Sequence, residues 1–401
     1  MKRRIGQQVF WTIFFAAVRP FARPILCYRY RREKRVKGPA IILCNHNLDT
    51  DIGLLGLSYR QAMRVVASEH IFRLGILTLL IRLFFAPIMR MKGKTEIMTV
   101  RNILTTVKNG GRVCIFPEGN RSFNGLTGEI TQATASLVKL AKCSLITYRI
   151  EGGYFKHPRW ARKGRRGPVY GQEVGRYTPE ELSQMSVDEV LRLIRSDLHE
   201  DAYARQAEHP APYKGKRLAE SIETALYLCP KCGGIGTLHS QDDRFACACG
   251  LDMRFTELGM LEGVSGGEAP FATVTAWDLW QQGETEKLVT GAASCVITED
   301  EQLSLYRIQP GERDELIETG KLSISRGGLM CGSFLFPLED ISDLAIIAIN
   351  TLVFELRNGS YFEIRSKGAY SALKYRRLFL HCKKTAKGEC DAGAGAAQTG
   401  L

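Results

Sequence analysis

The 401-residue sequence lacks an uninterrupted apolar run of the roughly twenty residues that a helix needs to cross a membrane. Residues 9–18 are apolar but too few, and the longer stretch 71–91 is interrupted by Arg73, Arg82 and Pro87. We expect both stretches to lie in a core or at a membrane surface rather than to span a bilayer. The sequence also has no internal repeat, and its Gly-Lys pairs lack the spacing of a phosphate-binding loop.

Acidic residues are scarce relative to basic ones. The chain has 42 Asp and Glu against 55 Lys and Arg, a net charge of +13. Such an excess predicts an acidic partner, either nucleic acid or an anionic membrane surface. Basic residues flank the apolar run at 2–4 and 29–37, which favours the membrane. We expect residues 1–37 to form an interfacial segment, with aromatic side chains among lipids; a cleaved signal peptide fits less well, because arginines follow the run closely.

Two polar segments each follow a short apolar run. Residues 45–51 read Asn-His-Asn-Leu-Asp-Thr-Asp, and residues 116–122 read Phe-Pro-Glu-Gly-Asn-Arg-Ser. His46 and Asp51 are five residues apart, so they can meet only across a bend, which a strand, a loop and a helix provide. A histidine and an acid can activate a hydroxyl, and an arginine on a turn suits a phosphorylated substrate. Because ligands bind beyond the carboxyl ends of strands in open α/β sheets, we expect one crevice to hold both segments.

The order and separation of these segments resemble the lysophosphatidic acid acyltransferase (glycerolipid acyltransferase) family, whose motifs are NHxxxxD and FPEGxRS. The resemblance covers about residues 38–205 and implies an α/β domain, a mixed sheet flanked by helices, at residues 38–220. It implies that His46 is the general base and that Asp51 orients it. It also implies a set of residues that bind the acceptor's glycerol phosphate: Glu118, Gly119 and Arg121, with Arg90 from a weaker second block.

The resemblance implies transfer of a fatty acyl group from acyl-CoA or acyl-carrier protein to the sn-2 hydroxyl of 1-acylglycerol 3-phosphate, giving phosphatidic acid. The location implied is the cytoplasmic face of the membrane, as a monotopic or peripheral protein. The apolar segment 145–150 lacks the proline of the family's fourth block, so the donor and the acceptor stay open. Another lysolipid acceptor is one alternative, and a non-catalytic zinc-ribbon binding protein is another. Four cysteines are expected to be core residues rather than nucleophiles: Cys27, Cys44, Cys114 and Cys143.

A basic stretch at residues 156–166 contains six Lys and Arg around Trp160. Its two interpretations are a solvated loop and a surface that contacts the phosphates of lipids or of a coenzyme A donor.

Four further cysteines form two pairs on glycine-rich turns. Cys229 and Cys232 are followed after fourteen residues by Cys247 and Cys249. Paired thiolates with this spacing resemble a zinc ribbon, which we expect at residues 221–254. Because all four ligand positions are sulfur, the zinc is expected to be structural. The segment 238–245 has no basic and aromatic stripe, so no nucleic-acid partner is expected.

Beyond the ribbon the sequence alternates short apolar segments with turn signals such as Arg357-Asn358-Gly359. Five strands and a closing helix at 370–382 are expected. Residues 255–384 resemble a mainly β domain of the pleckstrin-homology-like or GRAM-like kind with a C-terminal helix. The Ala- and Gly-rich residues 385–401 are expected to be a disordered tail.

Overall fold

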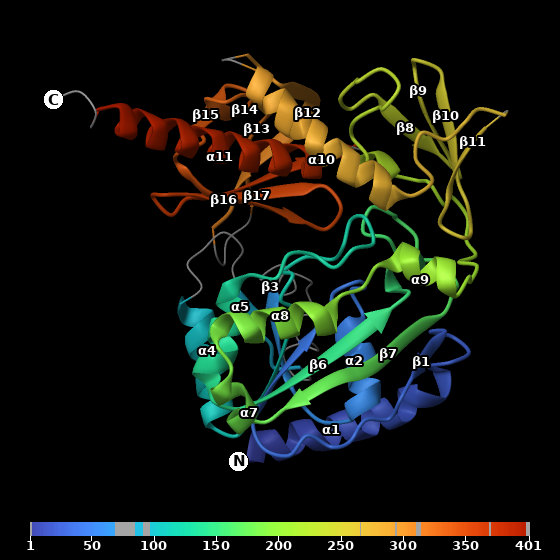
Figure 1. Cartoon of the computed structure of the whole chain (residues 1–401), viewed down its shortest axis with the longest axis vertical. Helices are drawn as coiled ribbons and strands as arrows, with labels where there is room; N and C mark the ends of the chain where they lie inside the picture. Colours follow the sequence, from blue (N-terminus) through green and yellow to red (C-terminus); the bar gives the residue numbers. More distant parts are fainter. Residues whose placement is uncertain are drawn as a thin grey trace.

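The computed structural model describes residues 2–68, 85–90, 97–264, 266–292, 295–309, 314–368 and 370–397. Most of the apolar stretch 71–91 therefore lies outside the described residues. Figure 1 shows an α/β part formed by the N-terminal half and a mainly β part formed by the C-terminal half. Among the helices that the structure describes, none is long and apolar enough to cross a membrane.

A mixed seven-stranded sheet forms the centre of the N-terminal half, in the order β1-β7-β6-β2-β5-β3-β4. All neighbouring strands are parallel except β6 and β7, which are antiparallel. The strands are β1 (Tyr28–Tyr30), β2 (Ala40–Cys44), β3 (Arg64–Ser68), β4 (Ile88–Arg90), β5 (Arg112–Ile115), β6 (Ser144–Glu151) and β7 (Val169–Tyr177). The central strand β2 is wholly buried, as its unbroken apolar sequence predicts for a strand covered on both faces.

Helices cover both faces of this sheet, which confirms the predicted α/β architecture. Ile42 and Cys44 pack with α1 (Lys2–Val18) and α2 (Asp51–Tyr59) on one face. Ile41 and Leu43 point to the other face. The helices on that second face are α4 (Ile97–Lys108), α5 (Gln132–Ala141) and α8 (Val187–Leu198).

Residues 179–208 form three helices in the structure. These are α7 (Pro179–Gln184), α8 and α9 (Ala202–Glu208). Ser186 begins α8 with a capping box to Glu189, and Asp201 caps α9 by accepting from two backbone N–H groups. Each cap satisfies N–H groups that lack an intrahelical partner, so a new helix starts there.

The N-terminal helix is only partly available to lipid. Trp11 and Phe15 are buried, and Phe15 packs against Gly56 of α2, where any side chain would collide with the ring. Ile13 and Phe14 are exposed. Of the aromatic residues expected among lipids, these two belong instead to the core between α1 and the sheet. A short helix, η1 (Arg19–Phe21), follows α1.

The cysteine-rich region is a four-stranded antiparallel sheet in the order β11-β10-β9-β8. Its strands are β8 (Leu238–Gln241), β9 (Arg244–Cys247), β10 (Leu251–Phe255) and β11 (Leu261–Gly263). This sheet continues past the predicted boundary at residue 254, because β11 pairs with β10. One hydrophobic cluster joins it to the first half of the chain, and includes Phe155 and Trp160 on one side and Phe245 and Trp277 on the other. Two further short helices are α6 (Gly153–Lys156), between β6 and β7, and η3 (Ile222–Thr224), between α9 and β8.

The remaining strands form a seven-stranded antiparallel sheet in the order β15-β14-β13-β12-β18-β17-β16. They are β12 (Thr298–Arg307), β13 (Glu315–Ile324), β14 (Gly328–Cys331), β15 (Phe334–Pro337), β16 (Ile341–Ile347), β17 (Thr351–Leu356) and β18 (Tyr361–Ser366). The expected mainly β character is confirmed. In Figure 1, α10 (Val274–Gly291) and α11 (Ala372–Ala397) lie side by side, and β16 and β17 lie on the side nearest the α/β domain.

Three features of this half differ from the sequence-based expectation. Helix α10 has eighteen residues in a region where the sequence predicted no helix. Strands β14 and β16 are not among the five predicted strands. The expectation of a disordered tail from residue 385 is also wrong as far as Ala397, because α11 continues to that residue. Alanine has the highest helix propensity, so the alanines of this tail favour continuation of the preceding helix.

Candidate active site and metal site

The first motif forms the connection between a buried strand and a helix. Strand β2 ends at Cys44, and α2 begins at Asp51. His46 Nδ1 lies 3.0 Å from Asp51 Oδ2, so the bend brings the two side chains together. The same carboxylate oxygen accepts from the backbone N–H groups of Asn47 at 2.8 Å and Leu48 at 2.9 Å. Asp51 is fully buried and the His46 side chain is 23% exposed, so the acid is fixed while the imidazole reaches the surface.

The second motif follows β5 and touches the first. Glu118 Oε1 accepts from the backbone N–H of His46 at 2.7 Å, and Oε2 accepts from that of Gly128 at 2.5 Å. The Phe116 ring stacks on the His46 imidazole, with centroids 4.5 Å apart. The backbone N–H of Ser122 donates to His46 O at 3.3 Å. The two segments therefore line the same site at the carboxyl ends of β2 and β5.

The Glu118 carboxyl group has a raised pKa of about 8, chiefly because burial disfavours its charged form, although the two backbone N–H groups oppose the shift. Both of its oxygens are already hydrogen-bonded within the protein. The structure thus gives Glu118 the role of joining the two motifs; its contact with the acceptor stays a prediction.

Two arginines lie at the same end of the sheet. Arg121 Nε is 3.4 Å from Asp49 Oδ1, and its Nη1 donates to His157 O at 3.5 Å. Arg90 ends β4, and its Nη1 would lie 3.2 Å from a Cβ atom added at Gly119. Gly119 has φ +69°, a conformation that favours glycine, and its lack of a side chain leaves room for the Arg90 guanidinium. All six residues of the predicted active site are thus brought to one region.

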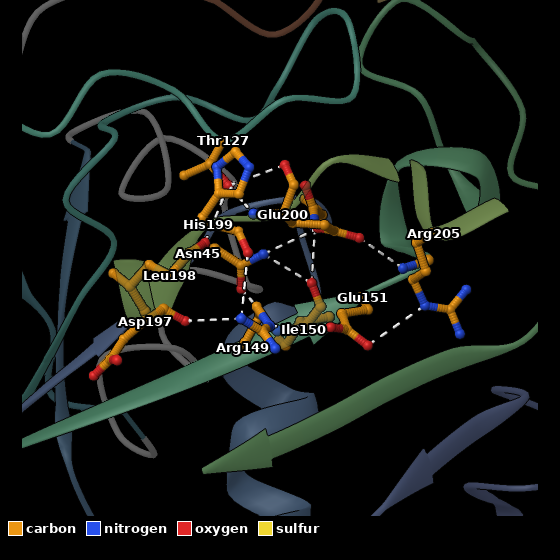
Figure 2. A network of polar contacts seen from close by, with 12 residues as sticks. Asn45, Thr127, Arg149, Ile150, Glu151, Asp197, Leu198, His199, Glu200 and Arg205 are labelled. Carbon is orange, nitrogen blue, oxygen red and sulfur yellow. Dashed lines mark hydrogen bonds and ion pairs between the residues drawn. The ribbon is translucent and has the colours of Figure 1, made fainter. Parts of the chain in front are cut away.

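Behind the first motif lies a buried glutamate that the sequence did not single out. Glu200 Oε2 accepts from the amide groups of Asn45, at 3.1 Å, and Asn47, and Oε1 accepts from Gly152 N at 2.9 Å (Figure 2). The Asn45 amide also donates to Ile150 O at 2.8 Å and its oxygen accepts from Ile150 N at 2.7 Å. The residues on either side of His46 are therefore attached to β6 and to the start of α9.

Burial raises the pKa of Glu200 to about 8, against the hydrogen bonds from Gly152 and Asn47, which lower it. Thr127 exchanges hydrogen bonds with the backbone of Glu200, and Arg205 and Arg149 each pair with Glu151 nearby (Figure 2). No local pattern marks Glu200 in the sequence, because its partners lie more than forty positions away. The asparagines beside His46 are the one available signal, since two amides at the end of a buried strand need an acceptor.

The cysteines near the site are poor nucleophiles. Cys44 and Cys114 are fully buried, and burial is the main cause that raises the pKa of each thiol. Burial likewise raises the pKa of Cys143 to about 11. A thiolate is the reactive form, so these three residues are core residues, as expected. Cys27 is partly exposed, which contradicts the expectation that it belongs to the core.

The second group of cysteines forms a compact cluster. The Sγ atoms of Cys229, Cys232, Cys247 and Cys249 all lie within 4.8 Å of one another. Gly233 and Gly250 have positive φ values and donate backbone N–H groups to the carbonyls of Cys229 and Cys247, which closes each turn. Four sulfur donors converging in this way can hold a tetrahedral metal ion, and the donor set suits zinc. His239, in β8, is outside the cluster.

The basic stretch 156–166 is not uniformly solvated. Arg159 and Arg165 are buried. Arg165 donates to Leu218 O at 2.5 Å and lies over the rings of Trp160 and Phe255. Lys156 is half-buried and Arg166 is exposed; both line a hollow of about 400 Å3 with Pro24, Ile25, Gly164 and Arg165.

Comparisons with known proteins agree with this site. Residues 26–151 match the family model described as Acyltransferase, and this segment contains both motifs. The chain therefore contains an acyltransferase domain, which implies an acyl donor as co-substrate.

Among solved structures similar to the chain is the crystal structure of the 1-acyl-sn-glycerophosphate (LPA) acyltransferase PlsC from Thermotoga maritima. The match has 15% sequence identity and a TM-score of 0.38, and covers 52% of this chain and 97% of that chain. No curated protein matches the chain significantly.

Proposed function

We propose that the protein transfers a fatty acyl group from acyl-CoA or acyl-carrier protein to the free hydroxyl of a lysophospholipid, with 1-acylglycerol 3-phosphate as the acceptor. The observation that carries the proposal is the 3.0 Å contact between His46 and Asp51 beside the turn that carries Arg121. Phosphatidic acid and the free thiol of the donor are the products.

The contact between His46 and Asp51 supports one direction of proton transfer. When Nδ1 carries the proton donated to Asp51, the Nε2 atom of neutral His46 has the free electron pair. His46 then accepts the hydroxyl proton as the acceptor oxygen bonds to the acyl carbonyl carbon. When the carbon–sulfur bond breaks, the imidazolium returns this proton to the thiolate that leaves. Asp51 stabilises the imidazolium, so the cycle needs no covalent acyl-enzyme.

Acceptor binding is assigned to the positive groups around the turn. Arg121 supplies a guanidinium group from the turn, and Arg90 supplies another from the end of β4. One guanidinium can bind two phosphate oxygens at once. Gly119 permits the Arg90 side chain to approach the turn. Glu118 supports this arrangement indirectly by bonding the turn to the His46 backbone.

The membrane-facing surface is assigned to α1 and the segment after it. Exposed apolar side chains there are Val9, Ile13, Phe14, Phe21 and Ile25. Ile25 also lines the hollow that contains Lys156 and Arg166, so apolar and cationic groups adjoin. This combination favours attachment to an anionic lipid surface, with the apolar residues among acyl chains and the cations on phosphates. We place the protein on the cytoplasmic face, as a monotopic or peripheral protein.

The C-terminal half is assigned two structural modules. The cysteine cluster is a zinc ribbon with one structural Zn2+. Seven antiparallel strands followed by helix α11 support a pleckstrin-homology-like or GRAM-like domain. Neither module supplies a residue to the proposed chemistry.

The proposal is tested by mass spectrometry of the lipids that the purified chain forms from a panel of lyso-acceptors with both donor types. Phosphatidic acid is expected from 1-acylglycerol 3-phosphate, and thiol release should require the acceptor. His46→Ala should reduce the rate by about a thousandfold or more, since it removes the base. If only a different lysolipid gave a product, that lysolipid would be assigned as the acceptor. If no acceptor gave a product, the proposal would be rejected.

A further inference from the structure

The acceptor loop, defined here as residues 121–125, is held by the C-terminal half of the chain. Arg159 makes the first connection. It donates from Nη1 to Arg121 O at 3.2 Å, from Nη2 to Ile346 O at 3.1 Å and from Nε to Ala348 O at 3.2 Å. One side chain thus ties the backbone of a proposed phosphate-binding residue to the end of β16 and the turn that follows it.

Arg159 is also stacked and buried. Its guanidinium lies 4.2 Å from the centroid of the Phe123 ring, and the residue is 4% exposed. In the described part of the chain no carboxylate lies within ion-pair distance of it, and its hydrogen-bond partners are backbone carbonyls. Burial, followed by the nearby Arg121 and Arg376, lowers the pKa of Arg159 to about 9. Burying a cation without an ion-pair partner costs folding free energy. Loss of the carbonyl groups that accept from Arg159 would raise that cost further.

Helix α10 makes a second, separate connection. Thr275 Oγ1 donates to Asn124 O at 2.6 Å, and the Asn124 amide donates to Asp278 Oδ2 at 2.9 Å. Asp278 is itself fixed by Arg377 of α11, whose two terminal nitrogens lie 2.6 and 2.7 Å from its oxygens. The loop is therefore attached both to α10 and, through Asp278, to the closing helix.

We propose that the C-terminal half acts as a clamp that sets the conformation of the acceptor loop, and that Arg159 and Thr275 are positioning residues for acceptor binding. The inference rests on the proposed function, because it assigns the loop to the acceptor phosphate. Arg159 does not reach the chemistry itself. It fixes the Arg121 backbone, from which the Arg121 side chain extends toward Asp49 and His157.

The clamp predicts a specific kinetic signature. In Arg159→Lys one ammonium replaces three fixed donors, so the acceptor KM should rise about tenfold while kcat and the donor KM change less than about twofold. The matched control is Arg165→Lys. Arg165 is equally buried and also donates to a backbone carbonyl, but its contacts are Leu218, Trp160 and Phe255 rather than the loop. A water-soluble short-chain acceptor without membranes should be used.

A milder pair of variants keeps the test valid if Arg159→Lys does not fold. Thr275→Val removes one hydrogen bond to the loop and should raise the acceptor KM about threefold. Thr290→Val, at the other end of α10, removes only an intrahelical bond to Glu286 O and should leave the acceptor KM unchanged.

Hydrogen–deuterium exchange supplies a readout that needs no activity. Amides of residues 121–125 should exchange faster in Arg159→Lys and Thr275→Val than in the wild type, and not in the two controls. Unchanged acceptor KM and unchanged exchange in both variants would overturn the clamp. If the wild type acylates no acceptor, the proposed function fails, while faster exchange in both variants still supports the clamp and unchanged exchange rejects it.

Discussion

Glu118 accepts a hydrogen bond from the backbone N–H of His46 at 2.7 Å, so the turn of the second motif holds the backbone of the first. The other oxygen of the carboxyl group is bonded to Gly128 N at 2.5 Å. The position of the proposed base therefore depends on a residue seventy-two positions later in the chain. This dependence leads to the first prediction.

Glu118→Gln should impair both activity and stability. The amide nitrogen of glutamine must face one of the two backbone N–H groups, which leaves a donor without an acceptor and costs about 1–3 kcal/mol of unfolding free energy. We expect kcat to fall at least tenfold because His46 is displaced. Urea unfolding and initial rates measure the two effects. Glu129→Gln, an exposed neighbour, is the control and should change neither; wild-type behaviour of Glu118→Gln would contradict the structural role.

Glu200 predicts a pH dependence of stability. Its pKa is raised by burial to about 8, from an ordinary value of 4.5, so between these pH values the folded state retains a proton that the unfolded state releases. The free energy of unfolding should therefore fall as pH rises from about 4.5 to about 8. The pKa of Glu118 is raised in the same way, so Glu118 adds to the fall in the free energy of unfolding.

Glu200→Gln should make this fall shallower, because it removes one of the two titrating groups. Urea unfolding at intervals between pH 5 and pH 8.5 measures the slope. The control is Glu208→Gln, at the exposed end of α9. Equal slopes in Glu200→Gln and the wild type would show that Glu200 has no raised pKa.

The cysteine cluster predicts bound metal. We expect close to one zinc per chain by elemental analysis, because four sulfur donors converge within 4.8 Å. Cys232→Ser should lose the metal and lower the melting temperature, whereas Cys295→Ser, an exposed cysteine outside the cluster, should keep both. Metal-free wild-type protein with an unchanged melting temperature would refute a structural zinc.

The exposed face of α1 predicts where lipid binds. Ile13 is 64% exposed, so Ile13→Glu should leave the fold intact and reduce binding to vesicles that contain anionic lipid by about tenfold. Cosedimentation at several salt concentrations measures this binding, which should also weaken as salt increases. Leu316→Glu, an exposed apolar residue of β13, is the matched control. Equal binding of the two variants would assign the lipid contact to another surface.

The sequence predicted the local elements that form the candidate active site. An unbroken apolar run marks β2, and the polar residues that follow it mark the loop and the start of α2 at Asp51. The spacing of His46 and Asp51 meant that they could meet only across a bend, and the family resemblance implied that they do; the structure has them 3.0 Å apart. The four cysteines were likewise recognisable, because their spacing reflects the geometry of two turns.

The supporting residues could not be predicted, because their partners are distant in the chain. Glu200 lies 155 positions from Asn45, and Arg159 lies 187 positions from Ile346. Arg159 belonged to a basic stretch interpreted as solvated or phosphate-binding. Only the fold shows that backbone carbonyls surround it. Helix α10 was missed for a different reason. The face that it buries includes the polar residues Asp278, Gln281 and Thr285, so the sequence shows no apolar stripe there.

The hydrophobic cluster that unites Phe155 and Trp160 with Phe245 and Trp277 has a practical consequence for protein production. A fragment ending at Glu208 would include the whole segment that matches the acyltransferase family model, yet would lose Tyr213, which packs on Phe155, and Phe255, which packs on Trp160. Exposure of these aromatic rings to solvent would favour aggregation. Expression trials should therefore retain the cysteine-rich region and α10 together with the N-terminal half.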